Sequence, residues 1–196
     1  MIGYYLGNMR LSILQQFQYR AANYFYMIGM IAEPVVYLVV WSTIARSHGG
    51  SVDGLTPGDF AAYYIVWTLV RNMNIVLTPY AWEERIKDGS FSAELMRPIH
   101  PIHEDLASFA GWKAVVVVLW IPIAVALVLL FRPSLSPSLL QCVVFSFAIW
   151  GAYLVRQIFQ WTLGLVTFWT TRVGAFFDGF YLSEMVLSGR IFPLVL

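Results

Sequence analysis

An uninterrupted run of eighteen uncharged residues, AVVVVLWIPIAVALVLLF, extends from Ala114 to Phe131. A helix needs about 20 mostly apolar residues to cross the hydrocarbon core of a bilayer, and 18 without a charge already make a candidate span. Apolar residues make up 59% of the chain and charged residues only 12%, whereas about a quarter of the residues in a soluble domain are charged. The sequence therefore predicts an all-α, polytopic membrane protein.

Five hydrophobic segments follow one another, at about residues 22–45, 60–82, 114–131, 138–169 and 173–189. As a single helix the fourth would be about 48 Å long, more than a bilayer core of about 30 Å, so we expect it to tilt or to extend into the cytoplasm. Gly151 and Gly164 within it are candidates for a bend or for close helix packing. No internal repeat is visible, and we expect one transmembrane domain over residues 1–196.

Residues 1–21 predict an N-terminal helix that lies in the membrane interface. Apolar side chains recur there at helical spacing, at Leu6, Met9, Ile13, Leu14 and Phe17, opposite Asn8, Ser12, Gln15 and Gln16. An amphipathic helix of this kind lies in the plane of the interface, with its apolar face toward the lipid. The alternative is a frayed polar extension that precedes the first span.

The distribution of Lys and Arg predicts the orientation. A cytoplasmic N-terminus places seven basic residues inside, namely Arg10, Arg20, Arg85, Lys87, Arg97, Lys113 and Arg172. It places three outside, namely Arg46, Arg132 and Arg190. Cytoplasmic loops carry an excess of Lys and Arg, so this orientation is favoured. Five spans would then end outside, at GRIFPLVL; we therefore expect a sixth span and interpret the chain as a fragment that lacks it.

Residues 83–113 form a charged segment between the second and third spans, with four of the twelve basic and six of the eleven acidic residues. Gly89 breaks the chain after the second span, and Ser90 is the predicted N-cap of a short helix from Phe91 to Arg97. Pro98 disfavours helix at Arg97 and ends it there, and Pro101 extends the break. A second helix is predicted from about Ile102 towards the third span.

The short helix is predicted to present Phe91, Leu95 and Met96 on an exposed, cytoplasmic surface. Exposed apolar residues that lie together mark a site where another protein or a membrane docks. The sequence therefore predicts a docking element for a soluble partner. The alternative is a re-entrant or interfacial turn that packs on the lipid.

Five charged residues lie within the predicted spans, namely Glu33, Arg71, Arg156, Asp178 and Glu184. An isolated charge at the centre of a span costs roughly 2.5–3.5 kcal/mol on insertion scales, so such residues face the bundle interior, an aqueous cavity or an interface. Two interpretations stay open: a lining for a substrate path with pairs that exchange partners, or static pairing of two bases with three acids. Pro34 next to Glu33 predicts a kink in the first span.

The chemistry of nucleotides is absent from the sequence. It has no GxxxxGK[ST] loop to hold phosphates, and neither a GxSxG nor an HExxH motif. The single cysteine, Cys142, excludes an intramolecular disulfide and a cysteine-built zinc site. His100 and His103 come closest to a metal site, but Pro101 lies between them and a solvated loop pair explains them better. We therefore expect no metal site, no cofactor in this chain and no nucleic-acid partner.

An ordered set of short motifs completes the pattern. Ile86-Lys87-Asp88-Gly89 is followed by Glu94-Leu95-Met96-Arg97-Pro98, and Leu187-Ser188-Gly189 by Phe192-Pro193-Leu194 near the end. With the interfacial helix and the hydrophobic hairpin, this order resembles the export-type permease subunit of bacterial ABC transporters, in the branch with a central "I-x-x-G…L-x-R-P" loop. The resemblance covers essentially the whole chain, and its departure from the family is the missing sixth span.

The resemblance implies a multi-pass permease of the bacterial plasma membrane that dimerises with a second copy or a paralogue. Separate ATPase subunits would bind ATP and Mg²⁺. The loop after the second span would be the coupling helix, with its site residues at Gly89, Phe91, Leu95, Met96, Arg97 and Pro98. Its substrate would be hydrophobic or amphipathic, such as a drug, a lipid or a glycan, and Ser188 to Leu194 would lie at the outer end of the fifth span.

Two other functions remain open on the sequence alone. An ion-coupled secondary transporter would use Glu33, Asp178 or Glu184 as a proton relay, although the absence of an inverted repeat weakens that hypothesis. An intramembrane enzyme would use His100, His103 and Glu104.

Overall fold

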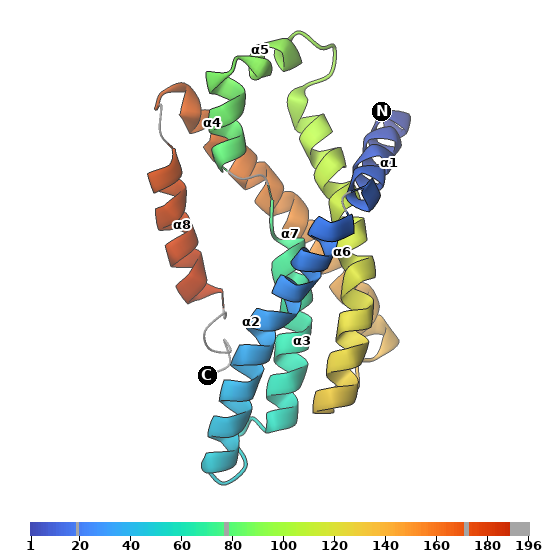
Figure 1. The fold of residues 1–196 in the computed structure, drawn as a ribbon, viewed down its shortest axis with the longest axis vertical. Coiled ribbons are helices and arrows are strands. Elements are labelled where there is room, and N and C mark those ends of the chain that lie inside the picture. The colour runs from blue at the N-terminus through green and yellow to red at the C-terminus, as the bar shows by residue number, and fades with distance from the viewer. Residues whose placement is uncertain (19, 77–78, 171–172, 189–196) are drawn as a thin grey trace.

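The structure, a computed structural model, describes residues 1–18, 20–76, 79–170 and 173–188. These residues form helices joined by short linkers, with one isolated β-bridge between Val52 and Leu55. The helices are α1 (Ile2–Gln18), α2 (Arg20–Ser47), α3 (Pro57–Met73), α4 (Pro79–Lys87), α5 (Ser90–Leu95), α6 (Pro101–Phe131), α7 (Leu139–Gly164), a 3₁₀ turn η1 (Leu165–Phe168) and α8 (Gly174–Leu187) (Figure 1). The all-helical fold class is therefore confirmed for the described residues.

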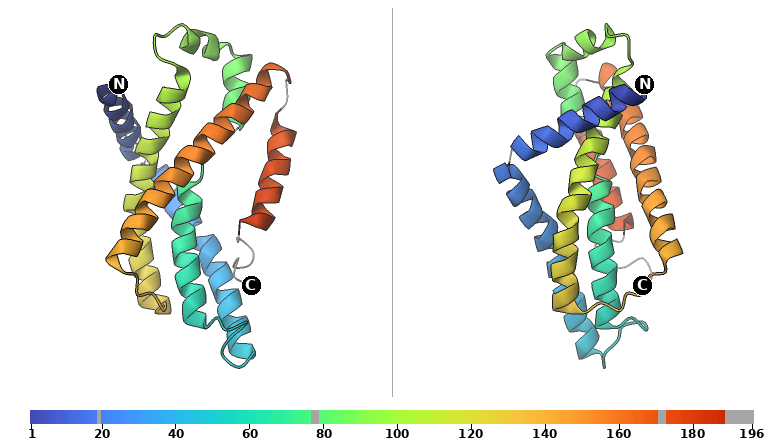
Figure 2. Two further views of the ribbon diagram at one scale, coloured as in Figure 1. Left: turned by 180° about the vertical axis from the view of Figure 1, so that it is seen from behind. Right: turned by 90° about the vertical axis from the view of Figure 1, so that its right-hand side faces the viewer.

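The bundle is elongated and has two unlike ends (Figures 1 and 2). The charged end holds α1, α4, α5, the start of α6 and the junction between α7 and α8. The linker end holds the connections at residues 48–56 and 132–138. Of the basic residues counted for the topology, Arg10, Arg85, Lys87 and Arg97 lie at the charged end and Arg46 and Arg132 at the linker end, whereas Arg172 and Arg190 lie outside the described residues.

Helices α6 and α7 carry the membrane character of the chain. Residues 101–131 and 139–168 form helices that are long and apolar enough to span a bilayer, and only 28% and 11% of their most apolar windows are buried. A core helix of a soluble protein would be mostly buried, whereas these helices expose apolar side chains such as Leu129 and Phe147. Such surfaces are suited to lipid.

The second predicted span, residues 60–82, is wrong as a single helix. Helix α3 ends at Met73, and Asn74 caps it with its backbone N–H on Val70 O and Arg71 O. Helix α4 begins only at Pro79. Proline disfavours helix in the residue before it, and asparagine is a poor helix former that favours termini, so this apolar stretch divides into two helices.

The fourth predicted span forms helix over the expected length. Of its two glycines, Gly164 is a site of close packing as predicted. Helix α7 gives way at Gly164 to the turn η1, and Trp82 of α4 packs there. A Cβ on Gly164 would lie 2.3 Å from the Trp82 Nε1 atom, so only glycine permits this approach. At Gly151, by contrast, nothing among the described residues lies within 4 Å of the equivalent position, so no close packing is seen there.

Helix α1 lies across the start of α6 rather than along the bundle (Figure 2). Ser12 Oγ donates a hydrogen bond of 2.7 Å to Ser108 O, and a Cβ on Gly111 would lie 2.5 Å from Met9 O. The predicted polar face therefore packs partly on α6 instead of facing water. Leu6, Leu14 and Phe17 point away from the bundle and are exposed, which suits the expected contact with the membrane interface.

Candidate functional site

The segment that contains α5 begins at a glycine for a conformational reason. Gly89 has a φ of +78°, a left-handed value that residues with a side chain adopt only with strain. Asp88 Oδ1 accepts a hydrogen bond of 2.8 Å from Ser90 N, which satisfies a free N–H of the first turn. The prediction that Ser90 caps the helix is therefore wrong: Ser90 is its first residue, and the aspartate beside the glycine provides the cap.

The exposed surface of α5 is smaller than predicted. Leu95 and Met96 are 54% and 88% exposed. Phe91, in contrast, is buried, and its ring centroid lies 5.2 Å from that of Trp82. The expectation that Phe91 belongs to the exposed surface is wrong, because this ring fastens α5 to α4. The helix ends at Leu95 with Met96 as its C-cap, slightly before the predicted end at Arg97, and Pro98 is exposed in the following turn.

Arg85 of α4 joins three helices at the charged end. Its Nη2 atom lies 2.6 Å from Glu94 Oε2 on α5, and its Nη1 atom lies 3.0 Å from Asp105 Oδ2 on α6. Trp161 of α7 donates a hydrogen bond of 3.0 Å to the same Asp105 carboxylate. Burial alone would lower the pKa of Arg85, but the hydrogen bonds and charges of Asp105 and Glu94 outweigh it and raise that pKa. The guanidinium is thus a fixed, fully charged link from α5 to the bundle.

The histidines and Glu104 do not converge. His100 is the N-cap of α6, His103 Nδ1 lies 2.7 Å from the Tyr5 hydroxyl, and Glu104 lies 2.6 Å from Arg97 Nη1. No group of three His, Cys, Asp or Glu side chains within the described ranges is arranged to hold a metal ion. These side chains position α1 and the turn after α5 against α6.

Four of the five predicted intramembrane charges form two pairs. Arg71 of α3 donates to Glu33 of α2, and Arg156 of α7 lies 2.5 Å from Glu184 of α8. Asp178 is exposed on α8 and makes no ion pair with either of these arginines. Each arginine also lies over an aromatic ring, Arg71 over Trp67 and Arg156 over Phe180. Each cation is therefore compensated by one acid and one π-face.

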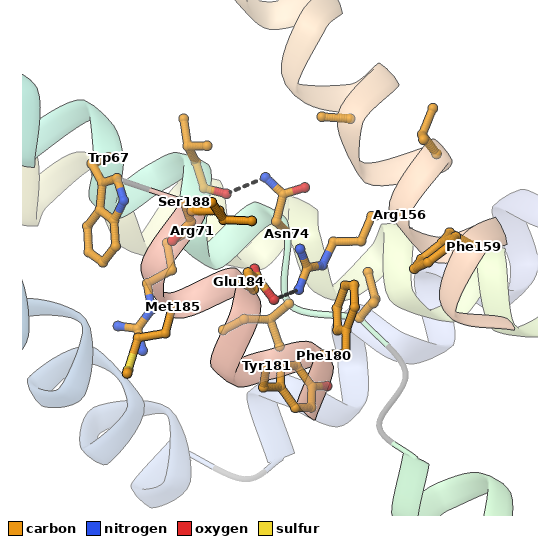
Figure 3. A pocket seen from close by; sticks show the side chains of 16 residues that line it. Trp67, Arg71, Asn74, Arg156, Phe159, Phe180, Tyr181, Glu184, Met185 and Ser188 are labelled. Atoms are coloured by element: carbon orange, nitrogen blue, oxygen red, sulfur yellow. Dashed lines mark hydrogen bonds and ion pairs between the residues drawn. The ribbon is translucent and has the colours of Figure 1, made fainter. Parts of the chain in front are cut away.

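These pairs flank a cavity of about 850 Å³ between α3, the linker after it, α7 and α8 (Figure 3). Its walls are largely apolar and aromatic, with few polar groups. The lining residues labelled in Figure 3 are Trp67, Arg71, Asn74, Arg156, Phe159, Phe180, Tyr181, Glu184, Met185 and Ser188. A cavity of this size with a few convergent polar groups is typical of a site for a small or amphipathic molecule. That these two arginines from separate helices line one cavity was not predictable from the sequence.

Two charged residues have structural contacts that the sequence did not indicate. Lys113, which the sequence places in the solvated loop, is fully buried; its Nζ atom donates a hydrogen bond of 2.9 Å to Asn72 O and lies 4.0 Å from the centre of the Trp112 ring. Glu83 Oε1 accepts hydrogen bonds from the backbone N–H groups of Val173 and Gly174, at 2.7 and 3.0 Å. No sequence pattern distinguishes either from a lysine or glutamate of an exposed helix end.

Comparison with known protein families gives a match over most of the chain. The family model described as "ABC-2 family transporter protein" matches residues 31–196, which include α5, both arginine pairs and the cavity. Neither a curated protein nor a solved structure gives a match. The match takes in far more than half of the chain and agrees with its apolar helices and with the resemblance of its motifs. The chain belongs to the ABC-2 family of transporter proteins, as a membrane permease component rather than an enzyme.

Proposed function

We propose that this chain is the membrane-spanning subunit of an ATP-driven exporter and that α5 docks into a separate ATPase. The observation that supports this most directly is the exposure of Leu95 and Met96 on a helix that Arg85 links rigidly to α6. Exposed apolar side chains that lie together mark a site where another protein or a membrane docks. ATP and Mg²⁺ would be bound by that partner, and closure of the ATPases would press on α5.

The N-terminus and the charged end lie on the cytoplasmic side in this proposal, in the plasma membrane of a bacterium. The sorting of basic residues between the two ends supports it. The exposed apolar residues of α1, namely Leu6, Leu14 and Phe17, would rest in the cytoplasmic interface.

Two permease subunits, identical or paralogous, would form the translocation path. The cavity beside Arg156 and Glu184 combines a mostly apolar wall with a few charged groups, which suits a hydrophobic or amphipathic substrate such as a drug, a lipid or a glycan. No observation among the described residues favours a proton relay, because Glu33 and Glu184 are both paired with arginines.

The test is purification of the protein in mild detergent with identification of the proteins that accompany it. We expect a stoichiometric ATPase with a phosphate-binding loop. Met96→Asp should abolish its retention, because a charge would replace the most exposed apolar side chain of α5. Leu135→Asp, a matched change of an exposed leucine at the linker end, should leave retention unchanged.

A wild-type protein that purifies without any ATPase would overturn this proposal and favour the ion-coupled transporter. Retention that survives Met96→Asp together with Leu95→Asp would overturn the docking role of α5 alone. Transport that collapses with the proton gradient but survives ATP depletion would distinguish the ion-coupled alternative.

A further inference from the structure

Helix α8 forms one wall of the cavity but is held by few contacts. Phe177 is its only buried residue among those described. Its side-chain links to α7 include the pair between Arg156 and Glu184, the Arg156 guanidinium over the Phe180 ring, and the contact of Phe159 with Phe180, whose ring centroids lie 5.6 Å apart. Figure 2 shows α8 standing apart from the α2–α3–α6 core. Its position therefore depends on what fixes its first turn.

Among the described residues, one carboxylate caps that turn, in which Val173 and Phe177 are also buried. Glu83 Oε1 accepts hydrogen bonds from the N–H groups of Val173 and Gly174, at the start of α8. Glu83 Oε2 lies 3.0 Å from Lys87 Nζ on its own helix. A carboxylate on the unpaired N–H groups of a helix N-terminus is favourable both as a hydrogen-bond acceptor and as a charge at the positive end of the helix dipole. The hydrogen bond from Lys87 and those from the two N–H groups lower the pKa of Glu83, so it stays charged.

The same short helix, α4, also carries Arg85. Glu83 and Arg85 are two positions apart, which at 3.6 residues per turn is a rotation of about 200° around the helix axis. Their side chains therefore point to opposite sides of α4. Helix α4 thus presents Arg85 to Glu94 of α5 and Asp105 of α6, and Glu83 to the first turn of α8. The helix is nine residues long and is continuous with the segment that leads into α5 (Figure 1).

We propose that Glu83 is a positioning residue that transfers a displacement of α5, through α4, to α8 and so changes the width of the cavity. The proposal rests on the proposed function, because it requires a partner that moves α5. It differs from a purely static helix cap, which would hold α8 in place whatever happened at α5. The two roles separate when the position of α8 is measured with and without nucleotide.

The experiment uses the full complex in lipid nanodiscs with Cys142 replaced by serine. Spin labels on Leu154→Cys of α7 and Leu182→Cys of α8, both exposed positions, report the distance across the cavity wall. We expect trapping of the ATPase with ATP and vanadate to shift this distance by about 2–5 Å, the range of helix shifts and one-turn displacements in known switches. A reference pair on Val118→Cys and Leu140→Cys does not involve α8.

Glu83→Ala should abolish the nucleotide-dependent shift while the ATPase is still retained. Glu83→Gln keeps an acceptor for the two N–H groups and should preserve most of the shift. Glu84→Ala, a matched removal of the exposed neighbouring acid, should behave as the wild type. A full shift in Glu83→Ala, or no shift in a wild-type complex that retains its ATPase, would overturn the proposal.

Failure of the proposed function gives a different result. If no ATPase accompanies the chain, the transfer role falls with it, and only a cap remains to be tested on the isolated chain. In that preparation Glu83→Ala should broaden the distribution of distances between residues 154 and 182 relative to Glu84→Ala. An unchanged distribution would show that Glu83 does not position α8 at all.

Discussion

The two ends of the bundle close their helices in different ways. At the charged end, four of the six ion pairs among the described residues join α4, α5 and α6 or stiffen α4. At the linker end, α3 and α7 start with capping boxes, at Thr56 with Asp59 and at Ser138 with Gln141. Two hydrogen bonds of Ser134, from Oγ to the Asp59 carboxylate and from the backbone N–H to Gly58 O at 3.2 Å, link the second connection to the start of α3. The two pairs of Arg85 are largely buried, whereas Lys87 and Arg97 are mostly exposed. The charged end is thus held mainly through one guanidinium, and the linker end through short caps.

Among the changes that test this difference between the two ends, Arg85→Ala is expected to reduce stability most. It removes the one cation that compensates both Glu94 and Asp105, whose side chains are 18% and 10% exposed. Breaking a buried pair by deleting one partner costs about 3–5 kcal/mol, and somewhat less when the partners are partly exposed. We expect the free energy of unfolding to fall by about 2–4 kcal/mol, measured by unfolding with sodium dodecyl sulfate from a mild detergent.

Lys87→Gln is the matched control for this change. Lys87 lies on the same helix, but its side chain is 57% exposed, and exposed pairs contribute about 0–1 kcal/mol. Equal losses of unfolding free energy in the two variants would show that the buried pairs of Arg85 stabilise the charged end no more than the exposed pair of Lys87 does.

A smaller effect is expected from Gly111→Ala at the contact of α1 with α6. The new Cβ would lie 2.5 Å from Met9 O and 2.9 Å from Met9 Cα, both backbone atoms, so α1 must move. Insertion of a methyl group into a packed contact costs about 1–3 kcal/mol. Gly151→Ala, where nothing lies within 4 Å, should instead be neutral or stabilising by up to about 1 kcal/mol. Both variants are measured in the same unfolding assay. An unchanged free energy of unfolding in Gly111→Ala would mean that α1 does not pack on α6.

The smallest effect belongs to the linker end and depends on pH. Hydrogen bonds from Ser134 and Thr56 lower the pKa of Asp59, so its contribution to stability is complete above the ordinary Asp value of about 3.9 and is lost as the pH falls through the lowered value. Asp59→Asn should therefore unfold at a lower temperature than the wild type at pH 7, by only a few degrees. The difference should shrink below about pH 4, and a difference that grows on acidification would contradict this assignment.

The sequence predicted those features that depend on neighbouring residues. The uncharged run before Phe131 marked the end of α6, and Gly89, Pro98 and Pro101 bracketed α5 correctly to within a few residues. Pro79 was an equally local signal, and the apolar residues around it concealed the break between α3 and α4. The predictions were wrong where the environment of a residue depends on contacts between elements that are distant in the sequence.

Tertiary contacts account for the remaining errors. Phe91 is buried because Trp82 and Phe168 lie against it, and no local pattern distinguishes it from the exposed Leu95. The pairing of Arg156 with Glu184 rather than with Glu33 or Asp178 depends on how α7 and α8 cross. The cavity is equally non-local, since its residues come from three helices and a linker. Composition predicted that such charges would need partners but gave no means of matching them.

The position of α1 has a consequence for the order of events during synthesis. Its anchors on α6 lie 96 to 98 residues later in the chain, as in the contacts of Ser12 with Ser108 and of Tyr5 with His103. At about 5–20 residues per second, translation needs roughly 5–20 s to deliver that stretch. Helix α1 therefore reaches these native neighbours only after α2 to α5 and the start of α6 have been made. Docking on α6 does not cover Leu6, Leu14 and Phe17, which stay exposed in the folded structure, so the membrane interface is the surface suited to them both before and after α6 is made.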